Sequence, residues 1–110
     1  MPPLDLSKIK TYPIAQRRNL VHLSDLLDPD APPPLFDHPE LAVVAQQVIA
    51  AGQAGCPVIW MMGAHVIKSG LSRILIRMLE LGIITHIAGN GAVSIHDFEL
   101  SLIGETSEDV

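Results

Sequence analysis

The stretch over residues 57–72 constrains the fold of this 110-residue chain more than any other. It begins with an apolar run, Val58 to Met62, which lies between Pro57 and Gly63. An uninterrupted apolar run of this length is typical of a parallel strand that is buried on both faces. A loop that ends in a second glycine follows, and then a helical pattern begins. Strand, glycine-bearing loop and helix in this order predict half of a βαβ unit.

The same order recurs immediately downstream. Residues 83–88 are predicted to form a second strand, residues 89–91 a polar loop, and residues 92–103 a helix. The helix predicted over residues 71–81 carries its apolar side chains on one side, and it joins the two strands. We therefore predict an α/β fold, an incomplete doubly wound (Rossmann-like) parallel sheet with an α-β-α-β-α core.

Two regions differ in composition. Residues 1–38 hold most of the nine prolines and are predicted to form an extended N-terminal arm, in which residues 20–27 can form a short helix or strand. Residues 39–110 are predicted to form a partial nucleotide-binding-like domain. Its first helix should start at Pro39, because proline favours the first helical position and Glu40 suits the first turn.

The C-terminal residues carry a further start signal. Thr106 or Ser107 followed by two acidic residues predicts the beginning of another helix. In addition, two parallel strands cannot cover both faces of a sheet or pair both of its edges. We therefore expect a fragment of a larger α/β protein, or a small chain that completes its sheet by self-association.

Composition narrows the possible partners. Hydrophobic residues make up 48% of the chain and charged residues only 17%, which predicts that a homo-oligomer or the remainder of a longer chain covers apolar surface. A net charge of −5 argues against nucleic acid as a partner. Residues 41–67 lack charged side chains, but their glutamines, glycines and Pro57 argue against a membrane span. The single cysteine, Cys56, excludes an internal disulfide and suits the cytoplasm; we expect it to be buried.

The two loops are the predicted ligand site, because the carboxyl ends of parallel strands meet at one edge of a sheet. Glycines there permit close approach of a ligand, and helix N-termini favour anions such as phosphate. Lys68 and Ser72 are further possible donors. The spacing is neither the dinucleotide fingerprint nor a P-loop, so a purely structural turn explains the glycines equally well. The candidate ligand-binding residues are Gly63, His65, Ser69, Gly70, Gly89, Asn90 and Gly91.

His96 and Asp97 are the candidate catalytic residues, near the start of the last predicted helix. They can act in proton transfer or contact a substrate. Because neighbouring helical residues point about 100° apart, two separate roles are favoured over one dyad. Asp97 shares its side of the helix with Ser94 and Ser101, and the apolar residues lie on another side.

Three segments resemble deoxyhypusine-synthase-like proteins, in particular the branch that shares their NAD-binding α/β domain. They read MMGAHVIKSGLS over residues 61–72, THIAGNGAVSIHDFE over 85–99 and TSEDV over 106–110. The resemblance covers about residues 39–110. It implies a doubly wound parallel sheet that binds NAD at the strand carboxyl ends, in an oligomer.

The active-site lysine of the synthases lies in a C-terminal signature that these segments do not contain, and Lys68 belongs to a different motif. The resemblance therefore implies a partial domain of an NAD-dependent enzyme that is inactive by itself. The alternative is a non-catalytic nucleotide- or small-molecule-binding module that self-associates.

Overall fold

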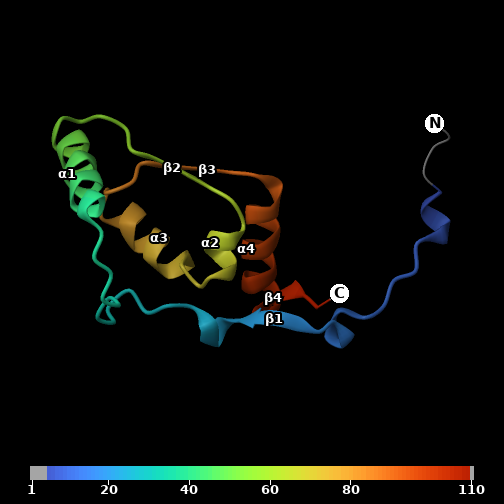
Figure 1. Cartoon of the computed structure of the whole chain (residues 1–110). Coiled ribbons are helices and arrows are strands. Elements are labelled where there is room, and N and C mark those ends of the chain that lie inside the picture. The colour runs from blue at the N-terminus through green and yellow to red at the C-terminus, as the bar shows by residue number, and fades with distance from the viewer. Residues whose placement is uncertain (1–4, 110) are drawn as a thin grey trace.

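Two short parallel strands lie at the centre of the fold. In the computed structural model, which describes residues 5–109, β2 (Ile59–Met62) pairs with β3 (His86–Gly89) (Figure 1). The register sets Trp60 beside Ile87 and Met62 beside Gly89. The predicted parallel pair is therefore confirmed, and the loops that follow the two strands lie at the same end of the sheet.

The helices follow local signals in the sequence. α1 (Pro39–Gln53) starts at the predicted proline, and the His38 side chain caps it by accepting from the backbone N–H of Glu40 at 3.3 Å. The crossover between the strands contains α2 (His65–Lys68), which was expected to be a loop, and α3 (Ser72–Glu80). α4 (Gly91–Ile103) follows β3 and ends at Gly104, whose φ of +74° is typical of a helix C-terminus.

The second strand begins later than predicted. Residues 83–85 do not belong to β3, because the backbone N–H groups of Ile83 and Ile84 donate to the carbonyl of Met78 at 2.9 and 3.3 Å. These bonds satisfy the last turn of α3, so the chain becomes extended only after them. Ile84 is almost fully buried, with 2% of its surface exposed.

The N-terminal segment contributes a strand of its own. After the short 3₁₀ turns η1 (Leu6–Lys8) and η2 (Ile14–Gln16), β1 (Asn19–His22) pairs antiparallel with β4 (Glu105–Glu108). η3 (Leu23–Asp25) follows β1 directly. The helix predicted to start at Thr106 or Ser107 is therefore wrong. The backbone there pairs with β1, which lies far away in the sequence, and local capping signals do not reveal such a partner.

The architecture is mixed α/β, with four α-helices and two separate two-stranded sheets in the described part of the chain. Two parallel strands do not establish a doubly wound sheet, so the Rossmann-like assignment stays a prediction. Within residues 5–109, each helix is too short or too polar to cross a bilayer.

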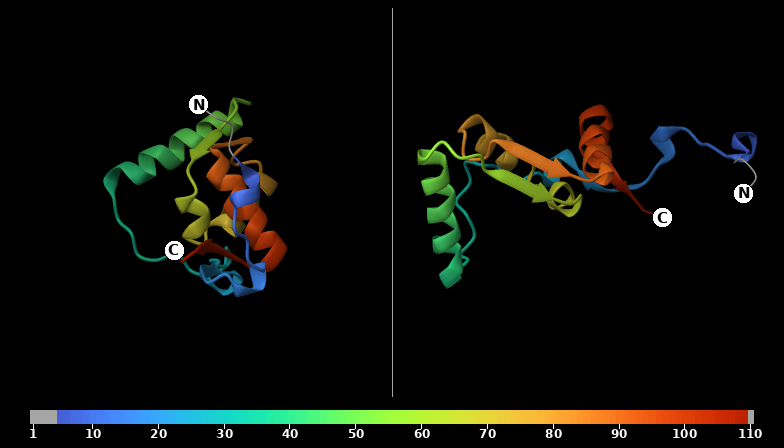
Figure 2. Two further views of the ribbon diagram at one scale, coloured as in Figure 1. Left: turned by 90° about the vertical axis from the view of Figure 1, so that its right-hand side faces the viewer. Right: turned by 90° about the horizontal axis from the view of Figure 1, so that it is seen from above.

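Little of the apolar content is buried. The buried apolar side chains are Val21, Ile67, Leu75, Ile84 and Leu100. The prediction that the run from Val58 to Met62 is buried on both faces is wrong: Trp60 exposes 38% of its surface and Met61 81%, because no second layer covers the sheet in the described part of the chain. Cys56, which was expected to be buried, is exposed as well. The helices α2, α3 and α4 cover one face of the β2–β3 sheet, whereas α1 stands beyond the amino end of its strands (Figures 1 and 2).

Gly70 lies where the turn between α2 and α3 contacts the segment after β1. Its φ is +81°, and its carbonyl accepts a hydrogen bond from the backbone N–H of Leu27 at 2.9 Å. A Cβ atom at this position would collide with the carbonyl oxygen of Asp25. Gly70 is therefore needed for close approach between the α2–α3 turn and the segment after β1.

We predict that Gly70→Ala destabilises the fold clearly more than Gly82→Ala, by at least about 1 kcal/mol. Gly82 has a similar φ of +68° but nothing within 4 Å of a built Cβ, so it controls for backbone strain alone. Urea unfolding followed by circular dichroism measures both. Equal losses of stability would show that the contact with Asp25 is unimportant.

Candidate ligand-binding site

A pocket opens where β2 and β3 end, between α3 and the first turn of α4. Its volume is about 410 Å³, which lies within the range of small-molecule sites. Its position matches the strand-end edge predicted from the sequence. The lining residues are Met62, Ile67, Ser72, Leu75, Ile76, Leu79, Ile87, Gly89, Asn90, Val93, Ser94 and Asp97.

A few polar groups interrupt this mostly apolar lining. The Ser72 side chain is buried, with 8% of the residue exposed, and its hydroxyl has no hydrogen-bond partner among the described residues. A buried hydroxyl without a partner is costly, and such groups mark sites where a ligand or water is expected to bind. Asp97 is the only charged residue among those described as lining the pocket.

The loop after β3 reaches the pocket as predicted. Gly89 and Asn90 both line it, and Gly91 begins α4 just outside it. Asn90 has ordinary extended backbone angles, and its side chain caps α4 by accepting from the backbone N–H of Val93 at 3.4 Å. A Cβ atom on Gly89 would press against the Val93 side chain, so glycine here permits close packing. Both residues therefore have structural roles beside their place in the pocket.

The segment after β2 reaches the pocket only through Ile67 of α2, and not through the residues predicted to bind a ligand. Gly63, His65, Ser69 and Gly70 are all absent from its lining. The backbone there forms α2, in which Lys68 N–H donates to the Ala64 carbonyl at 3.0 Å, so the chain coils instead of wrapping a ligand. His65 and Ser69 are exposed at the two ends of this helix.

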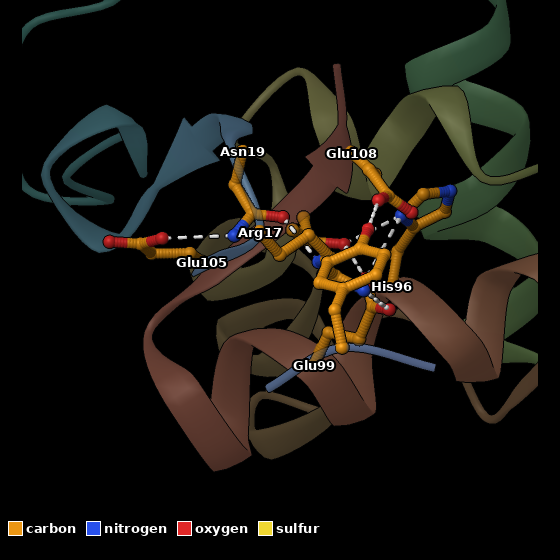
Figure 3. A network of polar contacts seen from close by, with 8 residues as sticks. Arg17, Asn19, His96, Glu99, Glu105 and Glu108 are labelled. Atoms are coloured by element: carbon orange, nitrogen blue, oxygen red, sulfur yellow. Dashed lines mark hydrogen bonds and ion pairs between the residues drawn. The ribbon is translucent and has the colours of Figure 1, made fainter. Parts of the chain in front are cut away.

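The two candidate catalytic residues face different surroundings, as their neighbouring helical positions suggested. Asp97 lines the pocket, whereas His96 is directed toward β4, with its Nδ1 2.7 Å from the hydroxyl of Thr106 (Figure 3). The structure therefore does not bring His96 and Asp97 into one site.

His96 belongs instead to a polar network that fastens the N-terminal segment to α4 and β4 (Figure 3). Arg17 donates to the Glu99 carboxylate at 2.6 Å, and its Nε donates to Asn19 at 2.8 Å. Asn19 in turn donates to Glu105 at 2.9 Å. Tyr12 also donates to Glu108. These bonds link parts of the chain that lie far apart in sequence.

Thr106 is the fully buried centre of this network. Its hydroxyl donates to the Glu99 carboxylate at 2.5 Å and contacts His96 Nδ1 at 2.7 Å. A hydroxyl has a single hydrogen to donate, so it accepts from His96, whose Nδ1 must carry the proton. His96 therefore has a structural role, because its hydrogen bond to Thr106 helps to hold β4 against α4.

Glu99 is held ionised. The hydrogen bond from Arg17 is the main reason why the pKa of this carboxyl falls to about 2 from its ordinary 4.5; the bond from Thr106 lowers it further, and burial opposes both. The same bond to Glu99 raises the pKa of the Arg17 guanidinium. The pair is largely buried, with 14% of the Arg17 side chain and 20% of the Glu99 side chain exposed.

A smaller cavity of about 250 Å³ adjoins the pocket. The two share Ser72, Ile76 and Asp97, and the smaller one continues toward Leu23 and Leu26 around η3. Ser94, Asp97 and Ser101, the polar side of α4 noted in the sequence, all line one cavity or the other. Nowhere in residues 5–109 do three metal-ligating His, Cys, Asp or Glu side chains gather.

Sequence periodicity does not predict the apolar wall that α3 adds to the pocket. Ile76 and Leu79 contribute to it although they are more than a third exposed. An apolar residue on a helix indicates burial, but it does not indicate whether protein or a ligand covers it. The sequence signals that did indicate this site are the loop after β3 and the spacing of the polar side of α4.

Comparison of the chain with family models, with characterised proteins and with solved structures finds no significant match.

The lowered pKa of Glu99 predicts a stability that depends on pH. Because the pKa is lower in the folded than in the unfolded chain, the ionised Glu99 stabilises the fold fully above about pH 4.5 and loses this effect as the pH falls toward 2. We expect Glu99→Gln to cost about 1–3 kcal/mol at pH 7. The difference from the wild type should shrink below pH 4.5, as measured by urea unfolding across pH.

Asp109→Asn serves as the control, because the Arg18–Asp109 pair is well exposed. It should change stability by less than about 1 kcal/mol. A Glu99→Gln effect of the same size at pH 3 and pH 7 would contradict the proposed ion pair.

Proposed function

We propose that this chain is a nucleotide-binding α/β domain, related to the deoxyhypusine-synthase-like proteins, whose ligand is NAD. The pocket at the ends of β2 and β3 is the observation that carries the proposal. Parallel strands present ligand sites at this edge, and residues of the first turn of α4 line the pocket, where the N-terminus of a helix favours a phosphate.

The chemistry of the lining suits parts of such a ligand. Its apolar wall from α3 and β3 favours a flat ring, and the Asp97 carboxylate can accept hydrogen bonds from ribose hydroxyls. The unpartnered Ser72 hydroxyl supplies a further polar contact. NAD would provide hydride-transfer chemistry when bound, and the residues that would hold it are Ser72, Gly89, Asn90, Ser94 and Asp97.

One observation favours a second candidate function. Asp97 is negative, and none of the residues described as lining the pocket is Lys or Arg. A pyrophosphate would thus depend on uncharged donors, such as the Ser72 hydroxyl and backbone N–H groups, and on the helix dipole. A pocket lining with one negative charge and no positive charge favours a non-catalytic module that binds an uncharged small molecule such as a nucleoside.

Calorimetric titration with NAD, ADP-ribose and adenosine separates the two functions. We expect NAD to bind, and Ser72→Ala to weaken its Kd by about 3- to 10-fold, which corresponds to the loss of one hydrogen bond. Because the variant removes a buried hydroxyl without a partner, its free energy of unfolding should stay equal or rise. Loss of binding together with loss of stability would contradict this assignment.

Ser24→Ala is the matched control, since Ser24 is exposed and lies outside the pocket lining. Binding of adenosine without binding of NAD would support the nucleoside-binding module. Binding of none of the three ligands would overturn both proposals.

A further inference from the structure

The outer face of the β2–β3 sheet has no covering layer. Met62, Ile87 and Gly89 face the pocket, so the alternation along each strand directs Ile59 and Met61 to the opposite side. Ile59 exposes 57% of its surface and Met61 81%. Their partners in the register, His86 and Ala88, are exposed on the same face.

α1 is a helix that has no apolar surface to pack against. None of its residues is buried, although Glu40 is its only charged residue. Leu41 and Val44 lie on one stripe and expose 51% and 54% of their surfaces, with the half-buried Val48 one turn further along. An apolar helix with a single charged residue is stable in a protein only when another apolar surface covers it.

The connection between α1 and β2 keeps α1 away from its own sheet. The backbone N–H groups of residues 54–56 all donate to carbonyls in the last turns of α1, at 2.9 to 3.0 Å. Gly55 has a φ of +69°, and Pro57 restricts the residue before it. This capped turn leads directly into β2, and α1 points off the amino end of the strands (Figures 1 and 2).

The exposed area sets an upper limit on the size of the missing contact. The chain exposes 8702 Å², whereas a compact monomer of this mass exposes about 6,000 Å². Its radius of gyration is 18.2 Å, compared with about 13 Å for a compact domain of this length. The excess is about 2,700 Å² per chain, or about 5,400 Å² for two chains, which is at the upper end of the total area that obligate homodimers bury; the extended N-terminal segment accounts for part of it (Figure 1).

We propose that α1 of one copy packs on the outer face of the β2–β3 sheet of a second copy, reciprocally. Each chain offers one bare apolar helix and one bare apolar sheet face, so a two-fold pair satisfies both at once. The α1 helix spans about 22 Å, long enough to cross both four-residue strands. The pocket lies on the opposite face of the sheet, so the dimer leaves it open.

Light scattering coupled to size exclusion should give the mass of a dimer for the wild type. Val44→Glu on α1 and Met61→Glu on the sheet should each weaken the dimer at least tenfold, because each places a charge at both copies of the contact. Leu6→Glu is the control: Leu6 lies on η1 and is 68% exposed, so its dimer should persist. Circular dichroism verifies that each variant remains folded.

Mixing the two charge variants makes the test specific. In a mixed dimer one contact carries both substitutions and the other is unchanged, so native mass spectrometry should detect a heterodimer tighter than either homodimer. A monomeric wild type would overturn the proposal. So would a dimer that withstands both substitutions, for example one formed through Phe98 on α4.

Packing of α1 on its own sheet is tested by a disulfide. In a Cys56→Ser background, cysteines at positions 44 and 61 should link two chains upon oxidation. A disulfide within a chain of monomeric mass would overturn the proposal. None of these measurements requires a ligand, so their failure is distinguishable from failure of NAD to bind.

Discussion

The parallel pairing of β2 with β3 is the constraint on which the candidate site depends. It sets Met62 and Gly89 side by side at one end of the sheet, so the two following segments must start from a common edge. α3 and the first turn of α4 then enclose the pocket there. With antiparallel strands the same side chains would lie at opposite ends. The site is thus a consequence of strand direction more than of the sequence of either loop.

Polar groups with partners and polar groups without them have different roles in this molecule. Arg17 and Thr106 both donate to Glu99, and these bonds hold α4 and β4 to the segment before β1. His96 completes this group, which explains why a histidine so close to the pocket does not enter it. Ser72, in contrast, is buried without a partner among the described residues. Because burial of a lone hydroxyl is unfavourable, a ligand or water is expected as its partner at the pocket.

Much of the apolar content of the chain lies on helix and sheet faces that no other part of the described chain covers. α1 and the outer face of the β2–β3 sheet are both exposed, and the apolar stripe of α4 around Phe98 is exposed too. A small core cannot offset the conformational entropy of so much ordered chain. Association through α1 would supply the second layer that an α/β sheet needs, and it would leave the pocket face free.

Local signals in the sequence determined the elements: Pro39 started α1, Gly104 ended α4, and the apolar run before Gly63 became β2. Such signals act within a few residues, so they can be recognised from a short stretch of sequence. Tertiary structure alone decided that Thr106 lies in a strand and that His96 turns toward it. Each of these depends on a partner many residues away. Pairing and packing at such distances leave no periodicity or capping pattern in the sequence.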